Sequence, residues 1–383
     1  MAIVNTHYGY CAKGGAVSKF TYSGEYNVRD DGVVELLTSG TIVFLEPKVI
    51  DVFMVGGGGG GASTARQSLT DKRAAGGGGG GGYTRTLRRI SVPANTQIPV
   101  TVGAGGQSGQ GGGSSAFNTA YTVNGGMSKG SYTGAGAFPG ADGGSGGGGG
   151  VLSNSDYGTG GSDGNNGESG YPTSVLGGKG QGFTTREFGE ATGKLYAGGG
   201  GGGRYMSAQS PVVSAGGSGG GGTGAWNSWY PANSQAAAAG VANTGGGGGG
   251  GAASQATAVQ DSNSGGSGGS GIVCFREAQE LPKLAGTWVL NERLYAPESD
   301  VYFANQDFTI GNTSNPNSAT VRNLICATAK IEYTTTMGYT YTLYTFSSNT
   351  WGTNKYTYLT FPAGATASDE FRAWLASNAT KQS

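Results

Sequence analysis

The side chains that could act as nucleophiles or metal ligands are few and far apart in this sequence. The 383 residues include one histidine, His7, and three cysteines, Cys11, Cys274 and Cys326. A zinc site needs about four such ligands, and an odd number of widely spaced cysteines is not a disulfide framework. Cys274 lies in the apolar run GIVCF and is predicted to be a small buried side chain. We therefore expect no metal site and no catalytic residue among these groups.

Two patterns that could carry chemistry have simpler structural explanations. The carboxylate pairs Asp30-Asp31 and Asp369-Glu370 could serve glycoside hydrolysis, but they fall at an expected turn and an expected helix start. Glycine patterns such as the one at Gly103–Gly106 would bind a dinucleotide only if a helix followed, and no helical periodicity follows them. The sequence predicts no cofactor and a protein that is not an enzyme.

Large aromatic side chains in glycine-rich surroundings are better candidates for a site, and they indicate binding. Trp226, Trp229 and Tyr230 lie in the segment AWNSWYP. The aromatic residues of the longest expected loop are Tyr157, Tyr171, Phe183 and Phe188. Aromatic rings on loops provide rigid contact area and can stack on sugars. We predict Trp226, Trp229, Tyr230, Tyr157 and Tyr171 as receptor contacts. The alternative, that they cover the end of a glycine core or contact a neighbouring subunit, has equal support.

The elements that would position these rings are dominated by glycine. Of 82 glycines, six lie before residue 56 and five after residue 271, so glycine makes up about a third of residues 56–271. Collagen also contains a third glycine, but it needs a strict Gly-X-Y period and abundant proline. Here the glycines form solid runs at 56–61, 76–82, 146–150, 198–203 and 245–251. Collagen is therefore excluded.

Two interpretations of the glycine runs remain. In one they are flexible spacers. In the other each run is a polyglycine II helix with three residues per turn, so that seven residues span roughly 22 Å. Such a helix has no internal hydrogen bonds, and without Cβ atoms neighbouring helices can bond backbone to backbone. The similar run lengths favour a packed bundle. The segments between the runs, including 114–145, 151–197 and 223–244, are expected to be loops.

Apolar strands frame the glycine window. Residues 1–55 read as an N-terminal β region, with a hairpin signal at Asp31-Gly32 and a last strand that leads into the first run. Residues 82–106 predict two more strands around a turn at Pro93–Asn95, and 272–276 predict a closing strand. We assign residues 56–276 to the glycine-rich bundle. A framed window of this kind argues against a flexible linker.

Residues 277–383 predict a small β-rich C-terminal domain of the α+β type. Alternating segments read as half-buried strands, and the tyrosines at 339, 341, 344, 356 and 358 fit a pattern of half core and half surface. The segment SDEFRAWLASNAT begins at Ser368 and places Phe371, Trp374 and Leu375 at helical spacing, which predicts a short terminal helix. The fold class expected for the whole chain is mainly β.

Charge and hydropathy exclude several classes of binding partner. The chain has 23 basic and 23 acidic residues, so no basic surface is predicted for nucleic acid or anionic lipid. No apolar run approaches the roughly 18 residues of a membrane helix, and the N-terminus has no signal-peptide pattern. We expect no nucleic-acid binding, no membrane insertion and synthesis in the cytoplasm.

The order of these segments resembles the glycine-rich domains of bacteriophage tail and receptor-binding proteins. The resemblance rests on KVIDVFMVGGGGGGA, GGGGYTRTLRRISVPANTQIPVTVGAGG, GGGSSAFN and GGSGGSGIVCFR. The ending LAGTWVLNERLYAP … ATASDEFRAWLASNAT is similar to a C-terminal module of phage and prophage tail proteins. Together these segments cover the chain from about Phe20 to Thr380. The long, uneven loops and the added C-terminal domain depart from the simplest tail adhesins.

The resemblance implies a virion protein, a tail or tail-fibre component that attaches the phage to its host. The implied partners are a host cell-surface receptor, either a polysaccharide or an outer protein, and other tail proteins. A homo-oligomer is expected by analogy. One alternative is a purely structural head or tail decoration or assembly subunit. A less favoured alternative is a tail enzyme that cleaves surface polysaccharide.

Overall fold

A computed structural model of the chain divides into two compact units, Met1–Ala278 and Gln279–Ser383. It describes residues 19–278 except 65–72, 133, 154–155, 162–176, 178–184, 207–213, 229–233 and 254–263. Within 281–382 it describes the strands and a few residues beside them. The predicted boundary after residue 276 lies two residues before the boundary between the units. Residues 1–18 of the predicted N-terminal region lie outside the described ranges.

The first unit begins as a sandwich of two antiparallel sheets. Sheet A contains, in spatial order, β1 (Phe20–Tyr22), β4 (Gly40–Phe44), β9 (Gln97–Thr101), β10 (Ser115–Phe117) and β11 (Tyr121–Val123). Sheet B contains β2 (Tyr26–Val28), β3 (Val34–Leu36), β20 (Ile272–Glu277), β5 (Lys48–Val55) and β8 (Thr84–Val92). The closing strand β20 is thus central in its sheet, because it pairs with both β3 and β5.

Strand β5 shows how sheet B is covered on two sides. Side chains of a strand point alternately to its two faces. Ile50, Val52 and Met54 enter the core between the two sheets. Phe53 and Val55 enter a second core on the outer face. All five are fully buried, and each buried side chain of this size contributes about 1.5–3 kcal/mol.

The two strands predicted within residues 82–106 form, but they do not pair with each other. Strand β8 pairs with β5 in sheet B, whereas β9 pairs with β4 in sheet A. The turn between them, where Asn95 has a φ of 55°, carries the chain from one sheet to the other. The hairpin at Gly32 is confirmed, because β2 pairs with β3 and Gly32 has a φ of 82°.

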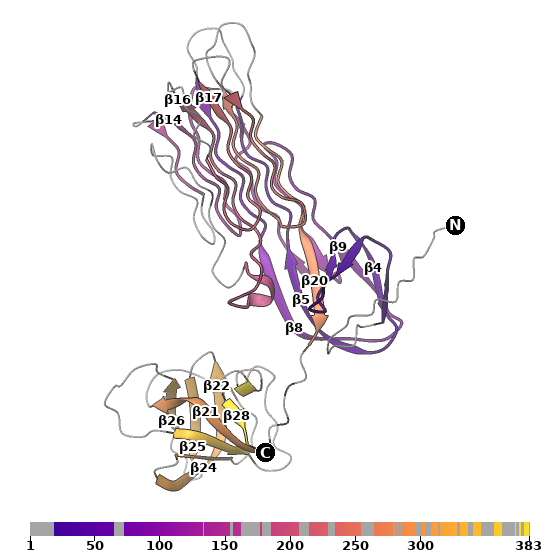
Figure 1. Cartoon of the computed structure of the whole chain (residues 1–383), viewed down its shortest axis with the longest axis vertical. Helices are drawn as coiled ribbons and strands as arrows, with labels where there is room; N and C mark the ends of the chain where they lie inside the picture. Colours follow the sequence, from indigo (N-terminus) through magenta and orange to yellow (C-terminus); the bar gives the residue numbers. More distant parts are fainter. Residues whose placement is uncertain are drawn as a thin grey trace. The chain divides into compact units, whose positions relative to one another are not determined.

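The glycine runs continue from this sandwich as a bundle of extended segments (Figure 1). In the run 56–61, every third N–H donates to the same neighbouring segment. The donor and acceptor residues are Gly56–Tyr83, Gly57–Gly113, Gly58–Gly269, Gly59–Gly80, Gly60–Gln110 and Gly61–Gly266. A period of three residues per turn is that of the polyglycine II helix. These hydrogen bonds join different segments and do not lie within one segment. The runs are therefore a packed bundle and not flexible spacers.

The run 76–82 is enclosed on all sides by other backbone. Its N–H groups donate to 124–127, 145–148 and 245–251, and its carbonyl groups accept from 56–62, 138–144 and 198–203. Six neighbours around one threefold helix make a hexagonal lattice of main chain. In an ordinary protein, backbone hydrogen bonds form helices and sheets, and side chains pack to form the core. In this bundle the backbone hydrogen bonds form the core.

Lack of space, and not an unusual backbone angle, explains the glycines of the runs. A Cβ placed on Gly79 would lie 2.1 Å from the carbonyl oxygen of Gly59, and one on Gly82 would lie 2.0 Å from that of Gly56. None of the residues of 56–61, 76–82 or 198–203 has a positive φ. A side chain in these runs would therefore force two backbones apart.

Outer segments of the bundle carry side chains at every third position. Ser264 is exposed and Ser267 and Ser270 are half-buried, whereas Gly265, Gly266 and Gly269 between them are buried. The carbonyl of Ser267 accepts the N–H of Gly240. This corrects the expectation that 114–145 and 223–244 are loops, since both contain further bundle segments. An outer helix needs glycine only on the faces that meet neighbours, so its composition looks like that of a loop.

The second unit is an antiparallel sheet. Six strands close into a ring in the order β24, β23, β27, β21, β26 and β25, and β25 pairs back to β24. Two short strands, β22 and β28, pair with β24 and β21. The strands are β21 (Gly286–Tyr295), β22 (Val301–Tyr302), β23 (Phe308–Asn312), β24 (Asn315–Ala327), β25 (Lys330–Thr335), β26 (Thr340–Thr345), β27 (Tyr356–Phe361) and β28 (Ala379–Lys381).

The terminal helix predicted from Ser368 is not seen as an element. Arg372, Leu375 and Ala376 have helical conformation, and the other residues of 368–378 lie outside the described ranges. The end of the predicted segment is extended, because Ala379 begins β28 and pairs with Leu290 of β21. The mainly β fold class is confirmed.

Candidate functional site

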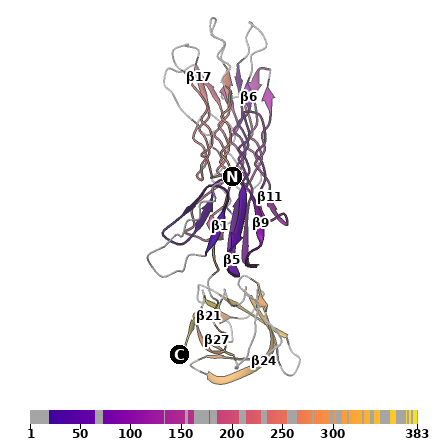
Figure 2. The same ribbon diagram turned by 90° about the vertical axis from the view of Figure 1, so that its right-hand side faces the viewer.

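Short strands cap the end of the bundle that lies away from sheets A and B; we call it the distal end (Figures 1 and 2). One sheet contains β15 (Asp156–Tyr157), β14 (Val151–Ser153), β16 (Arg204–Met206), β17 (Trp226–Ser228) and β18 (Ser234–Gln235). Two smaller sheets contain β12 (Ser131–Tyr132) with β6 (Ser63–Thr64), and β13 (Gly136–Ala137), β7 (Ala74–Ala75) and β19 (Ala252–Ala253). Several of these strands directly follow a glycine run, so the bundle sets their positions.

The structure describes two of the predicted receptor contacts, and these two differ in solvent exposure. Tyr157 in β15 is 44 % exposed, whereas Trp226 in β17 is only 2 % exposed. The ring of Trp226 is therefore part of the bundle cap and is not presented at the surface. Trp229, Tyr230 and Tyr171 lie outside the described residues, and their role stays a prediction.

Sequence reasoning missed the other large side chains that cap the bundle. Arg204 and Tyr205 are both buried in β16, and β16 pairs in parallel with β17, which places Arg204 opposite Trp226. Burial lowers the pKa of Arg204. The available signal was position, because Arg204 directly follows the run 198–203 and Trp226 follows Gly224-Ala225 at the end of a glycine-rich stretch.

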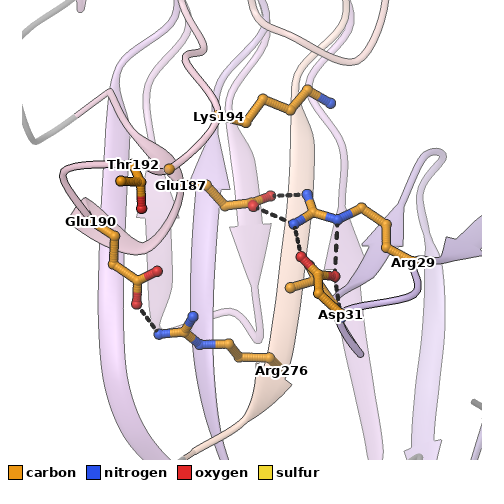
Figure 3. Close-up of a pocket in the computed structure, with 9 residues that line it drawn as sticks. Arg29, Asp31, Glu187, Glu190, Thr192, Lys194 and Arg276 are labelled. Carbon is orange, nitrogen blue, oxygen red and sulfur yellow. Dashed lines mark hydrogen bonds and ion pairs between the residues drawn. The ribbon is translucent and has the colours of Figure 1, made fainter. Parts of the chain in front are cut away.

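The second candidate is a charged hollow of about 550 Å³ on the outer face of sheet B (Figure 3). One wall comes from β20 and from the turn between β2 and β3. The other wall comes from residues 185–197, a segment that contains the 3-10 turn η1 (Glu187–Gly189) and that we call the strap. The lining side chains used below are Arg29, Asp31, Glu187, Glu190, Lys194 and Arg276.

Charges around the hollow are paired with each other. The Arg29 guanidinium lies 2.5 Å from the Asp31 carboxylate and 2.8 Å from that of Glu187 (Figure 3). Glu35 is reached by Arg29 at 3.4 Å and by the Lys194 ammonium at 3.5 Å. Arg276 forms ion pairs with Glu190 and with Asp51. A general acid or base needs a group able to exchange a proton with a substrate, and these carboxylates are instead engaged by cations.

The electrostatics agree with a structural cluster. The hydrogen bond from Arg29 lowers the pKa of Asp31, despite an opposing effect of burial. Burial alone raises the pKa of Glu35, but Asn27, Lys194 and Arg29 outweigh it, and the net shift is downward. Burial also raises the pKa of Cys274, which is fully buried nearby. Its thiol is therefore protonated at neutral pH and is not an activated nucleophile.

Aromatic side chains of the strap lie beneath these ion pairs. Phe188 and Tyr196 pack on Phe53 of β5, with ring centroids 6.1 and 5.3 Å apart. The Tyr196 hydroxyl donates to Glu187 at 3.1 Å. Phe188 belongs to the longest segment expected to be a loop, and its side chain is 1 % exposed, which agrees with packing and not with display at the surface. Residues 29, 187 and 276 meet here from distant parts of the sequence, and no short motif could have indicated it.

The described residues contain neither a cluster of metal ligands nor a membrane-spanning helix. No group of three His, Cys, Asp or Glu side chains there could hold a metal ion. No described helix is long and apolar enough to cross a membrane. His7 and Cys11 lie outside the described ranges.

Comparison with known proteins agrees with the architecture. No curated protein matches the chain. A family model described as a glycine-rich domain matches residues 38–278. The match begins just before β4 and ends at the boundary of the first unit, so it covers the bundle and the strands of sheets A and B other than β1, β2 and β3. Because it spans more than half of the sequence, the chain belongs to this glycine-rich domain family.

Proposed function

We propose that the protein is a bacteriophage virion component, of the tail or tail fibre, that attaches the particle to its host through the distal end of the bundle. The observation that carries this proposal is the main-chain core. Since the core is built from peptide groups, the residues between the runs at the distal end contribute little to it. They are free to differ in sequence without disturbing the scaffold.

Exposed chemistry at the distal end is consistent with recognition. Tyr157 and Asp156 are exposed in β15 at one edge of the five-stranded sheet, and Ser234 and Gln235 are exposed in β18 at its other edge. Aromatic rings combined with short polar side chains suit a sugar or a polar protein surface. The partner proposed is therefore a host polysaccharide or outer protein, with other tail proteins binding elsewhere on the chain. A homo-oligomer belongs to the same proposal.

Adsorption competition tests the proposal. Purified protein should bind cells of the susceptible host and block adsorption of the phage that carries it. Tyr157→Ala should weaken cell binding by about tenfold or more if the ring is a central contact. Val241→Ala is the matched control, because Val241 is also exposed, at 56 %, but it lies near the sandwich end of the bundle.

Other outcomes identify the alternatives. Failure of excess protein to bind cells or block adsorption would reject attachment and favour a structural decoration or assembly subunit. Release of reducing sugar from host polysaccharide would indicate a cleaving enzyme instead. Trp226→Ala is a poor test, since removal of a buried ring would act on stability first.

A further inference from the structure

The strap is a hairpin that is hydrogen-bonded within itself. The N–H of Tyr196 donates to Thr185 at 2.9 Å and that of Glu187 donates to Lys194 at 2.9 Å. Among the described residues, no main-chain hydrogen bond joins 185–196 to sheet B. The first main-chain bond to another segment is from Ala197 to Thr244 of the bundle, at 2.8 Å. The strap could leave the sheet without breaking its own backbone bonds.

Side chains alone hold the strap on the sheet. Charged contacts join Glu187 to Arg29 and Glu190 to Arg276. Arg88 donates to the carbonyl of Phe188, and the Arg276 guanidinium lies 4.2 Å from the Phe188 ring centroid. Phe188 has a φ of 51°, a left-handed conformation that a phenylalanine rarely adopts and that these contacts maintain.

An apolar face lies under the strap. It contains Val33, Phe53, Val55, Ile272 and Cys274, all of which are buried. The Cys274 sulfur lies 4.0 Å from the Tyr196 hydroxyl. Lifting the strap would bring this face, and the thiol with it, into contact with solvent.

We propose that the strap is a latch held by charge, which lifts from sheet B as one unit while the sandwich and the bundle stay folded. Glu187 is only 5 % exposed in its pair with Arg29, whereas the pair of Glu190 with Arg276 is partly exposed, at 44 % and 22 %. Salt screens such pairs, so ionic strength sets how often the latch opens. The inference concerns the base of the bundle and is independent of the proposed attachment at the distal end.

Cys274 is the reporter of opening. In the full chain carrying Cys11→Ser and Cys326→Ser, it is the one remaining thiol and reacts with a disulfide reagent such as DTNB only when uncovered. Raising NaCl from low to molar concentration should speed labelling by about tenfold, as expected for weakening of the pairs Glu190–Arg276 and Lys194–Glu35, in each of which the strap residue is about half exposed. Glu190→Gln and Arg276→Gln should speed labelling at low salt and reduce its salt dependence.

Two controls make the result decisive. Lys129→Gln removes a comparable ion pair, to Asp142 at 3.1 Å, on the bundle, and it should leave the labelling of Cys274 unchanged. Circular dichroism in the same urea series measures global unfolding. Labelling that depends on urea as steeply as global unfolding would overturn the latch, because Cys274 would then be exposed only when the whole unit unfolds. Labelling that is insensitive to salt and to Glu190→Gln would overturn the role of charge.

Discussion

Glycine has a different role at different positions of this chain, and the structure separates them. At Gly32 the residue permits a positive φ in a hairpin. At Gly79 the backbone angle is ordinary, and the hydrogen atom in place of a side chain lets the Gly59 carbonyl approach. At Gly111 a Cβ would have its nearest neighbour 3.5 Å away. The same residue type is therefore essential at one site in the bundle and replaceable at another.

Substitution of two of these glycines tests this distinction. Gly79→Ala should destabilise the first unit by about 3 kcal/mol or more, because the added methyl group must push apart two packed backbones. Gly111→Ala should have little effect or stabilise slightly, since alanine reduces the freedom of the unfolded chain. Thermal unfolding followed by circular dichroism measures both. Equal melting temperatures for the two variants would contradict a core made of main chain.

Within each polyglycine II helix, the number of glycines in every three residues indicates how many sides of the helix are covered by neighbouring segments. Runs of six or seven glycines, such as 76–82, have neighbours on every side. The segment 264–271 has serine at each third position and turns that side outward. In a strand, side chains alternate with a period of two, and a shift by one residue turns them toward the wrong face. In these helices the period is three, and a shift by one residue has the same effect.

Insertions should show this register. One glycine inserted between Gly268 and Gly269 turns Ser264 and Ser267 by a third of a turn, toward their neighbours, and should lower the melting temperature by about 5 °C or more. Insertion of Gly-Gly-Ser at the same place keeps the phase and should restore stability. One glycine added within 76–82 is the control, since every position there is equivalent and the surplus residue can move to the end of the run. Equal losses for one and three inserted residues would reject the threefold register.

The parts that sequence predicted are those with local signals. The strands β3, β5 and β20, the framed window and the polyglycine II core follow from apolar runs and solid glycine runs. The outer bundle segments within 114–145 and 223–244 were missed because side chains every third residue dilute the glycine signal. For Trp226 a receptor contact and a cover over the glycine core had equal support, because nothing local in the sequence distinguishes them, and its burial favours the cover. The charged cluster joins residues up to 225 positions apart in sequence, and only the folded chain brings them together.

The whole molecule combines two compact units, which should unfold separately in calorimetry at pH 7. The transition lowered by Gly79→Ala identifies the first unit. Asp31 and Glu35 belong to it, and their pKa values are lowered in the folded state from the ordinary 3.8 and 4.5. Their contribution is therefore present above those values and is lost as the pH falls below them.

Acid titration of the melting temperature checks this expectation. Between pH 5 and pH 3 the transition of the first unit should move to lower temperature, and Asp31→Asn should make that movement smaller. A single transition at pH 7 would contradict independent units. An acid dependence unchanged by Asp31→Asn would contradict the stabilising role of its pair with Arg29.

The hexagonal lattice of peptide groups also determines how stability varies with temperature. Unfolding an ordinary core exposes apolar area and raises the heat capacity by about 0.45 cal/K/mol per Å², whereas exposing polar area lowers it by about 0.26. Opening the lattice of 76–82 and its neighbours exposes mainly peptide groups, so the two contributions nearly cancel. The free energy of unfolding then changes almost linearly with temperature, without the strong curvature that weakens hydrophobic cores in the cold. A scaffold of this kind remains folded in the cold as well as in the warm.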